Sequence, residues 1–113
     1  MKEVNVKIQY KEKEYALVFN LNVMDAIQEE YGSLAKWGEL TSGDEPNAKA
    51  VIFGFMQMLN EGIDIENEEK GTSTPFFTLK QAGRLITEVG MDTASNALKE
   101  TVVKSTEGQE KNA

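Results

Sequence analysis

The sequence predicts an α+β fold in which an N-terminal antiparallel β-hairpin packs on about four α-helices in a single small domain. Apolar and polar residues alternate through residues 3–21, and later segments carry apolar residues at helical spacing. The chain has 113 residues, of which 40% are hydrophobic, so it is long enough to bury one core. We expect residues 1–104 to form the domain and residues 105–113 to form a flexible tail.

The alternating segment 3–21 predicts two strands joined by a short connection. One register makes a face of the hairpin wholly apolar, with the pairs Tyr10–Tyr15, Ile8–Leu17, Val6–Phe19 and Val4–Leu21. The connection reads KEKE and lacks the Asn-Gly or Asp-Gly of a tight turn, so we expect a four-residue loop. Because an isolated hairpin is marginally stable in water, its apolar face must rest on helices.

Residues typical of helix starts and ends divide the rest of the chain. The predicted helical segments are 23–31, a short helix or turn over 34–40, 46–61, 79–89 and 92–104. Asn22 and Thr78 are suited to cap the first and fourth of these segments. Gly32, Gly62 and Gly90 are each placed to end a helix. An acidic loop over residues 63–77 is expected to follow Gly62.

The residue types of most catalytic and metal sites are missing from the sequence. It contains no histidine and no cysteine, which removes the usual nucleophile pairs and transition-metal ligands. Asp64, Glu66 and Glu68 resemble the start of a calcium loop, but Glu69 stands where glycine is required and Pro75 where glutamate is required. We therefore predict a protein that is not an enzyme, with no catalytic residue, no cofactor and no metal site.

Charge and hydropathy restrict the partners. The net charge of −7 disfavours nucleic-acid binding, because such surfaces are built from clustered Lys and Arg. No apolar run is long enough to span a bilayer, and the N-terminus lacks the apolar region of a signal peptide. We expect a cytoplasmic protein with no membrane partner, and the sequence is compatible with a homo-oligomer.

Four apolar residues are the candidate partner-binding residues: Phe53, Met56, Met58 and Trp37. Phe53 lies outside the apolar arc of the predicted central helix, so it is either covered by another element or available to a partner. Methionine side chains are adaptable and suit a binding surface, although core packing is their more common role. Partner binding by these four residues is a hypothesis.

Three stretches carry a resemblance to a known family: VFNLNVMDAIQEEYGSLAKWGEL, MLNEGI and TLKQAGRLITEVG. They contain a break at Glu30-Tyr31-Gly32, a helix end from Leu59 to Gly62 and a helix start at Thr78-Leu79. Over about residues 15–104 the chain resembles the tail assembly chaperones of long-tailed bacteriophages, prophages and gene transfer agents.

The resemblance implies a non-catalytic protein that binds the tape-measure protein and helps to recruit tail tube subunits. It also implies that the protein acts in the host cell and is absent from the mature virion. Two alternatives remain open at this stage: a small structural or connector protein retained in the phage particle, and an acidic DNA mimic or inhibitor.

Overall fold

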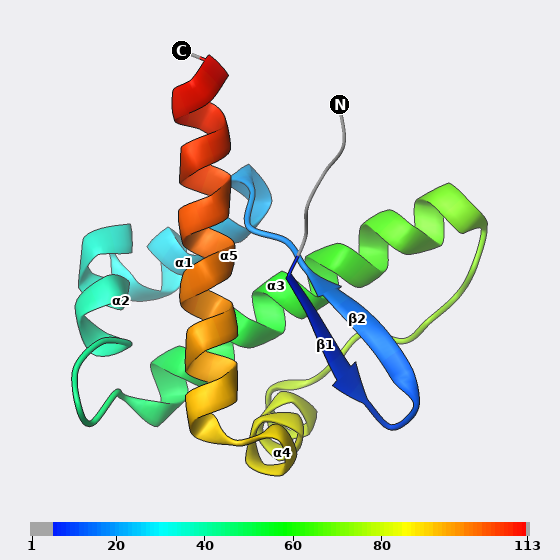
Figure 1. Ribbon diagram of the computed structural model, residues 1–113, viewed down its shortest axis with the longest axis horizontal. Coiled ribbons are helices and arrows are strands. Elements are labelled where there is room, and N and C mark those ends of the chain that lie inside the picture. The colour runs from blue at the N-terminus through cyan, green and yellow to red at the C-terminus, as the bar shows by residue number, and fades with distance from the viewer. Residues whose placement is uncertain (1–5, 113) are drawn as a thin grey trace.

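The computed structural model describes the backbone of residues 6–112 and the side chains of residues 6–106. This part of the chain contains two strands and five helices in one small domain (Figure 1). In chain order they are β1 (Val6–Tyr10), β2 (Lys13–Leu17), α1 (Leu21–Tyr31), α2 (Leu34–Leu40), α3 (Ala48–Lys70), α4 (Leu79–Val89) and α5 (Met91–Asn112). The predicted α+β class, with an N-terminal antiparallel hairpin packed on helices, is confirmed.

The hairpin has a tighter connection than predicted. Val6 pairs with Leu17, Ile8 with Tyr15 and Tyr10 with Lys13, so the register differs from the expected one by two residues. Lys11 and Glu12 form a two-residue turn with φ values of 50° and 65°, the left-handed geometry that matches strand twist even though neither is glycine. A shift of two residues keeps every side chain on its predicted face, which is why the alternation fitted both registers.

The ends of the hairpin also differ from the prediction. The second strand ends at Leu17, and Leu21 begins α1 instead of pairing across the sheet. The expected partner of Leu21, Val4, lies outside the described residues. The cap of α1 is Asn20, whose Oδ1 accepts a hydrogen bond from the Val23 backbone N–H at 3.3 Å. Asn22, the predicted cap, instead donates its side-chain amide to Glu61 of α3 at 3.0 Å.

Helix α3 is longer than the predicted central helix, because Gly62 does not end it. Gly62 is a buried interior residue of α3, and the carbonyl oxygen of Ala16 in β2 lies where a Cβ would stand. The Val18 N–H also donates to the Met58 carbonyl oxygen at 3.2 Å, so the end of β2 is joined directly to the helix backbone. Residues 63–70 of the segment expected to be an acidic loop are therefore helical, and α3 ends at Lys70 with Gly71 as its C-cap.

The other helix boundaries agree with the prediction to different extents. Gly32 and Gly90 end helices as expected, and Thr78 caps α4 through a reciprocal capping box with Gln81. The segment predicted over 46–61 begins at Ala48, after the cap residue Asn47. Helix α5 continues to Asn112, so the expected flexible tail from residue 105 is helical through that residue. The Ser105 hydroxyl donates to the Phe19 carbonyl oxygen at 3.0 Å.

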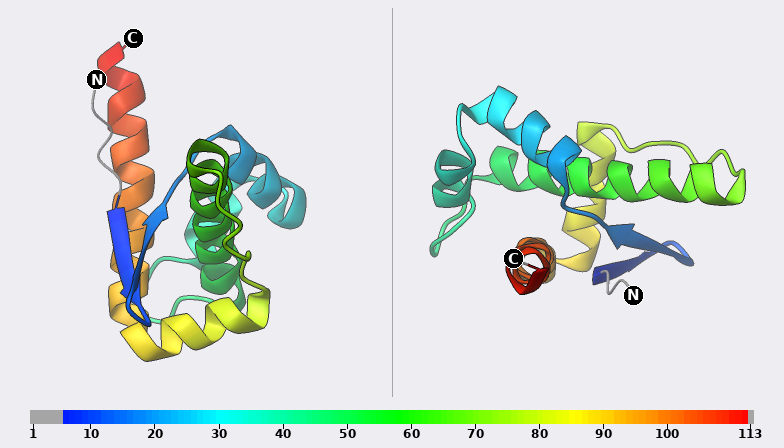
Figure 2. Two further views of the ribbon diagram at one scale, coloured as in Figure 1. Left: turned by 90° about the vertical axis from the view of Figure 1, so that its right-hand side faces the viewer. Right: turned by 90° about the horizontal axis from the view of Figure 1, so that it is seen from above.

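Helix α3 lies at the centre of the fold and contacts β2 and each of the other helices (Figures 1 and 2). The hairpin and α5 lie on one side of it, while α1 and α2 pack near its N-terminal half and α4 crosses beneath it. The largest fully buried side chains are Phe55, Leu17, Ile27, Met58, Leu59, Leu85, Val23 and Val51. The core is thus built around α3, with contributions from the hairpin and the other helices.

Candidate functional site: an aromatic cleft

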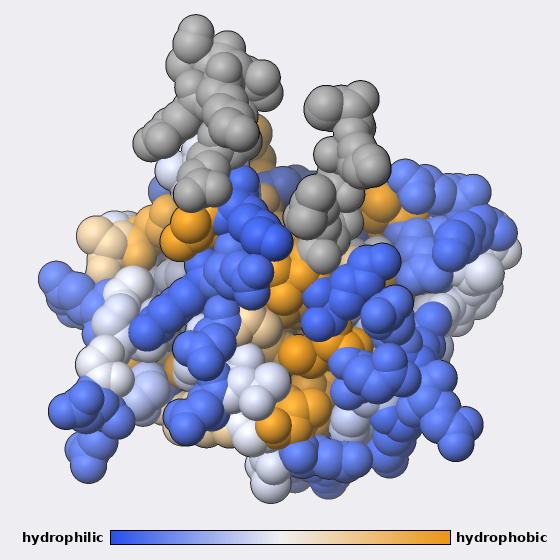
Figure 3. Space-filling view, viewed as in Figure 1, coloured by the Kyte–Doolittle hydropathy of each residue, from blue (hydrophilic) through white to orange (hydrophobic). Residues whose placement is uncertain are grey.

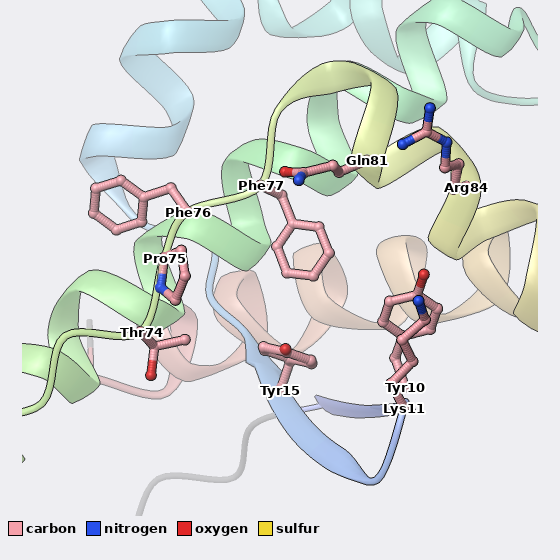
Figure 4. Close-up of a pocket in the computed structure, with 9 residues that line it drawn as sticks. All are labelled: Tyr10, Lys11, Tyr15, Thr74, Pro75, Phe76, Phe77, Gln81 and Arg84. Carbon is pink, nitrogen blue, oxygen red and sulfur yellow. The ribbon is translucent and has the colours of Figure 1, made fainter.

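The candidate site is a cleft of about 270 Å³ between the hairpin tip, the loop over residues 71–78 and the start of α4 (Figure 4). Its lining residues come from these three segments: Tyr10, Lys11, Tyr15, Thr74, Pro75, Phe76, Phe77, Gln81 and Arg84. The segments are distant in sequence, so the cleft exists only in the folded chain.

Four of the nine residues that line the cleft are aromatic. The Phe77 ring meets Tyr15 edge to face, with the ring centroids 5.3 Å apart, and lies 6.3 Å from the Tyr10 ring. Such arrangements are favourable and hold the rings in place. Phe76 is 54% exposed beside this group. Phe76 therefore extends this aromatic group to the surface of the protein.

Two asparagines of α3 fix the loop that carries Phe76 and Phe77. Asn60 donates to the Phe77 carbonyl oxygen at 3.0 Å and accepts from the Phe77 N–H at 2.8 Å. Asn67, about two helical turns further on, makes the same pair of bonds to Thr74, both at 3.1 Å. Each amide therefore satisfies both backbone groups of one loop residue, and the loop runs back along α3 in an extended form.

Cations border the aromatic rings. The Lys11 ammonium lies 5.5 Å from the centroid of the Tyr10 ring, and the Lys13 ammonium lies 5.4 Å from that of Tyr15. Both distances are within the range of a cation–π interaction. Arg84 adds a guanidinium from α4. No carboxylate is among the lining residues, although the protein is acidic as a whole.

The Tyr15 hydroxyl remains protonated at neutral pH. Burial raises the pKa of Tyr15 above its ordinary value, and the neighbouring Tyr10 raises this pKa further. A phenol in that state both donates and accepts a hydrogen bond. The cleft therefore presents a neutral, amphipathic aromatic surface with positive charges around it.

The four residues predicted to bind a partner lie elsewhere, and none lines the cleft. Trp37 and Met58 are buried in the core, and the Trp37 indole N–H donates to the Ala50 carbonyl oxygen at 3.0 Å. Phe53 and Met56 are half-buried on α3. Of the four side chains, only those of Phe53 and Met56 are thus partly exposed. A binding role for any of the four residues stays a prediction.

Phe53 is covered on one side by α1. Its ring meets that of Tyr31 edge to face, with the centroids 5.7 Å apart. The Tyr31 hydroxyl is buried without a hydrogen-bond partner among the described residues. Burial raises the pKa of Tyr31, and the adjacent Glu30 carboxylate raises it further. The Glu30-Tyr31-Gly32 break that carries the family resemblance therefore has a packing role, in which Tyr31 covers Phe53.

Sequence reasoning missed the cleft, although one signal was available. Pro75-Phe76-Phe77 places two aromatic residues in a polar, non-helical segment, where apolar side chains need either a partner or a place in the core. The surface seen in Figure 3 is mostly hydrophilic, with a band of hydrophobic residues between α5 and the hairpin.

Among the side chains of residues 6–106, no three His, Cys, Asp or Glu residues lie close enough together to hold a metal ion. None of the helices described for the chain is long and apolar enough to cross a membrane. Comparisons with protein-family models, with curated proteins and with solved structures give no match.

Proposed function

We propose that this protein is a tail assembly chaperone of a long-tailed bacteriophage or prophage, a non-catalytic protein that binds the tape-measure protein and assists tail tube assembly. The proposal places its action in the host cytoplasm and leaves it out of the mature virion. The choice of this family rests on the sequence resemblance over about residues 15–104. The aromatic cleft is the structural observation that supports a binding role.

The cleft has the properties of a protein-binding site. Phe76 is 54% exposed, while Phe77 is held by the Asn60 amide and packed on Tyr15. A preformed aromatic surface of this kind accepts an apolar side chain with little loss of conformational freedom, as in the centres of protein interfaces. A long helical tape-measure chain has stripes of apolar side chains that must be shielded from water before assembly. An open aromatic cleft can bind such side chains.

Co-expression tests the proposal. The partner to use is the tape-measure protein encoded in the same phage or prophage genome, produced with and without this protein. We expect the long chain to remain in the supernatant and to co-elute with this protein, and we expect Phe76→Ser to weaken that complex. The control is Val103→Ser, which changes an exposed apolar residue on α5 away from the cleft.

An insoluble long chain under both conditions, or no co-elution, would contradict a chaperone role. Mass spectrometry of purified particles provides a second test. A stoichiometric amount of this protein in the virion would instead support the structural or connector role.

A further inference from the structure

We propose that the cleft recognises a partner segment in which an aspartate or glutamate lies next to a large apolar side chain. This inference rests on the proposed function, because it specifies which part of a tape-measure chain the cleft would bind. It concerns the chemistry of the occupant, which the family resemblance leaves open.

The first argument is charge complementarity. The protein carries 19 acidic and 12 basic residues, yet the cleft lining contains Lys11 and Arg84 and no acidic residue. Lys13 adds a third cation over the Tyr15 ring. A surface whose local charge opposes that of the whole protein favours an anionic group and disfavours a basic one.

The second argument is that these cations form no ion pair with an acidic residue among the described side chains, residues 6–106. Among the described side chains, ion pairs join Lys70 to Glu66 and Lys104 to Glu100, and none involves the cleft cations. The nearest candidates along the chain do not neutralise them. Glu12 is exposed in the turn, Glu14 alternates to the opposite face of β2 from Tyr15, and Glu88 of α4 makes no ion pair with Arg84. A partner carboxylate would therefore compete with no ion pair for these cations.

The third argument is the arrangement of polar and apolar parts. In Figure 4, Arg84 lies on the same side of the cleft as Tyr10 and Lys11, while Pro75 and Phe76 lie on the opposite side, with Phe77 and Tyr15 between them. An occupant that matches this surface places an apolar side chain over the phenylalanines. It places a carboxylate beside the guanidinium, which binds carboxylates with two parallel hydrogen bonds.

The size of the cleft favours a side-chain pair over a whole ligand. Its volume of about 270 Å³ is slightly below the roughly 300–1,000 Å³ typical of small-molecule sites. It accommodates one or two side chains of a longer chain that continues over the surface. Aromatic rings with cations also suit single-stranded nucleic acid, but a polyanion would meet the strong negative charge of the remaining surface.

Peptide binding to the full-length protein tests the inference. The probes are three labelled peptides with identical phenylalanine and leucine positions, in which the intervening positions are all Glu, all Gln or all Lys. Fluorescence anisotropy should show the Glu peptide binding about five- to tenfold more tightly than the Gln peptide, because each exposed ion pair contributes a few-fold in affinity. The Lys peptide should bind weakest, and added salt should reduce the difference.

Variants assign the effect to the cleft. The double variant Lys11→Gln/Arg84→Gln should lose most of the preference for the Glu peptide over the Gln peptide, because only Lys13 of the three cations remains. Phe76→Ser should weaken binding of both. The matched control Lys99→Gln, an exposed cation on α5, should behave like the wild type. A thermal melt of each variant establishes that it is folded.

Equal binding of the Glu and Gln peptides to the wild type, tighter binding of the Lys peptide, or no binding of any peptide would each overturn the inference. So would tighter binding of an oligothymidine than of the Glu peptide. If the tape-measure protein binds the double variant as tightly as the wild type, the inference fails and the proposed function stands. If the Glu peptide binds through the cleft and the tape-measure protein does not bind at all, the proposed function alone fails.

Discussion

At the scale of single residues, Gly62 explains the largest difference between the predicted and the observed helix boundaries. A glycine after an apolar helical run is typical of a helix end, because glycine readily adopts a left-handed conformation. Here the absence of a side chain lets β2 approach α3, with the Ala16 carbonyl oxygen in the space of a Cβ. A glycine that ends a helix and a glycine that admits a neighbouring strand look the same in the sequence. Only the position of β2 in the folded chain distinguishes the two roles.

We predict that Gly62→Ala destabilises the protein. The added methyl group would overlap the Ala16 carbonyl oxygen, and β2 would have to move away from the helix. Forcing atoms into a packed core costs about 1–3 kcal/mol, and this exceeds the gain of up to about 1 kcal/mol from replacing a helical glycine by alanine. Urea denaturation followed by far-UV circular dichroism measures the change in the free energy of unfolding.

Gly83→Ala is the matched control for that measurement. Gly83 is also in a helix, but its added Cβ would meet Ile52 Cδ1 at 3.5 Å, an ordinary van der Waals distance. This variant should be as stable as the wild type or more stable by up to about 1 kcal/mol. If the two variants have the same stability, the close approach at Gly62 does not determine the packing of β2.

At the scale of elements, the cleft depends on how α3 holds the loop over residues 71–78. The loop has few buried side chains of its own, so the Asn60 and Asn67 amides supply its fixed geometry. Asn60 is the more important of the two for the cleft, because it bonds both backbone groups of Phe77.

We predict that Asn60→Ala releases the loop and disorders the cleft while leaving the fold intact. Limited proteolysis should cut within residues 71–78 faster than in the wild type, because both hydrogen bonds to Phe77 are lost and its ring is no longer held against Tyr15. The free energy of unfolding should fall by about 1–3 kcal/mol. Asn96→Ala, on an exposed position of α5, should change neither quantity. An unchanged cleavage rate in Asn60→Ala would contradict this account.

Local sequence patterns predicted the type of most elements but not the register of the hairpin. The fold class was predictable because alternation and helical spacing are local properties, and Thr78, Gly32 and Gly90 ended or began helices as expected. The hairpin register was predicted two residues off, because both registers bury the same face. The observed register requires a two-residue turn in which Lys11 and Glu12 have positive φ values. Neither residue type is typical of such a turn, so the sequence did not predict it.

The cleft was not predictable by the same reasoning. Its surface combines Tyr10 and Tyr15 of the hairpin, Phe76 and Phe77 of the loop, and Arg84 of α4. No periodicity relates these residues, and their proximity follows from the crossing of β2 over α3 and from the asparagine contacts to the loop. The residues that sequence reasoning did select for binding were partly core residues, since Trp37 and Met58 are buried.

At the scale of the whole molecule, α3 organises the fold. It contacts β2 and the other four helices, and Phe55, Met58 and Leu59 along it are fully buried. Helix α2, by contrast, has seven residues and one buried member, Trp37. Local opening occurs where few apolar contacts are lost, while the most connected element opens only when the whole domain unfolds.

We therefore predict a graded pattern of amide hydrogen exchange. Peptides from the middle of α3, around Phe55 to Leu59, should exchange only through global unfolding, with the same free energy as urea denaturation. Peptides from α2 should exchange at least about tenfold faster, and their rate should change little at low urea concentration because a local opening exposes little surface. Mass spectrometry of exchange at several urea concentrations measures both. If α3 exchanges as fast as α2, α3 does not form the stable centre of the fold. The close approach of β2 at Gly62 would then be too weakly held to position the hairpin side of the cleft.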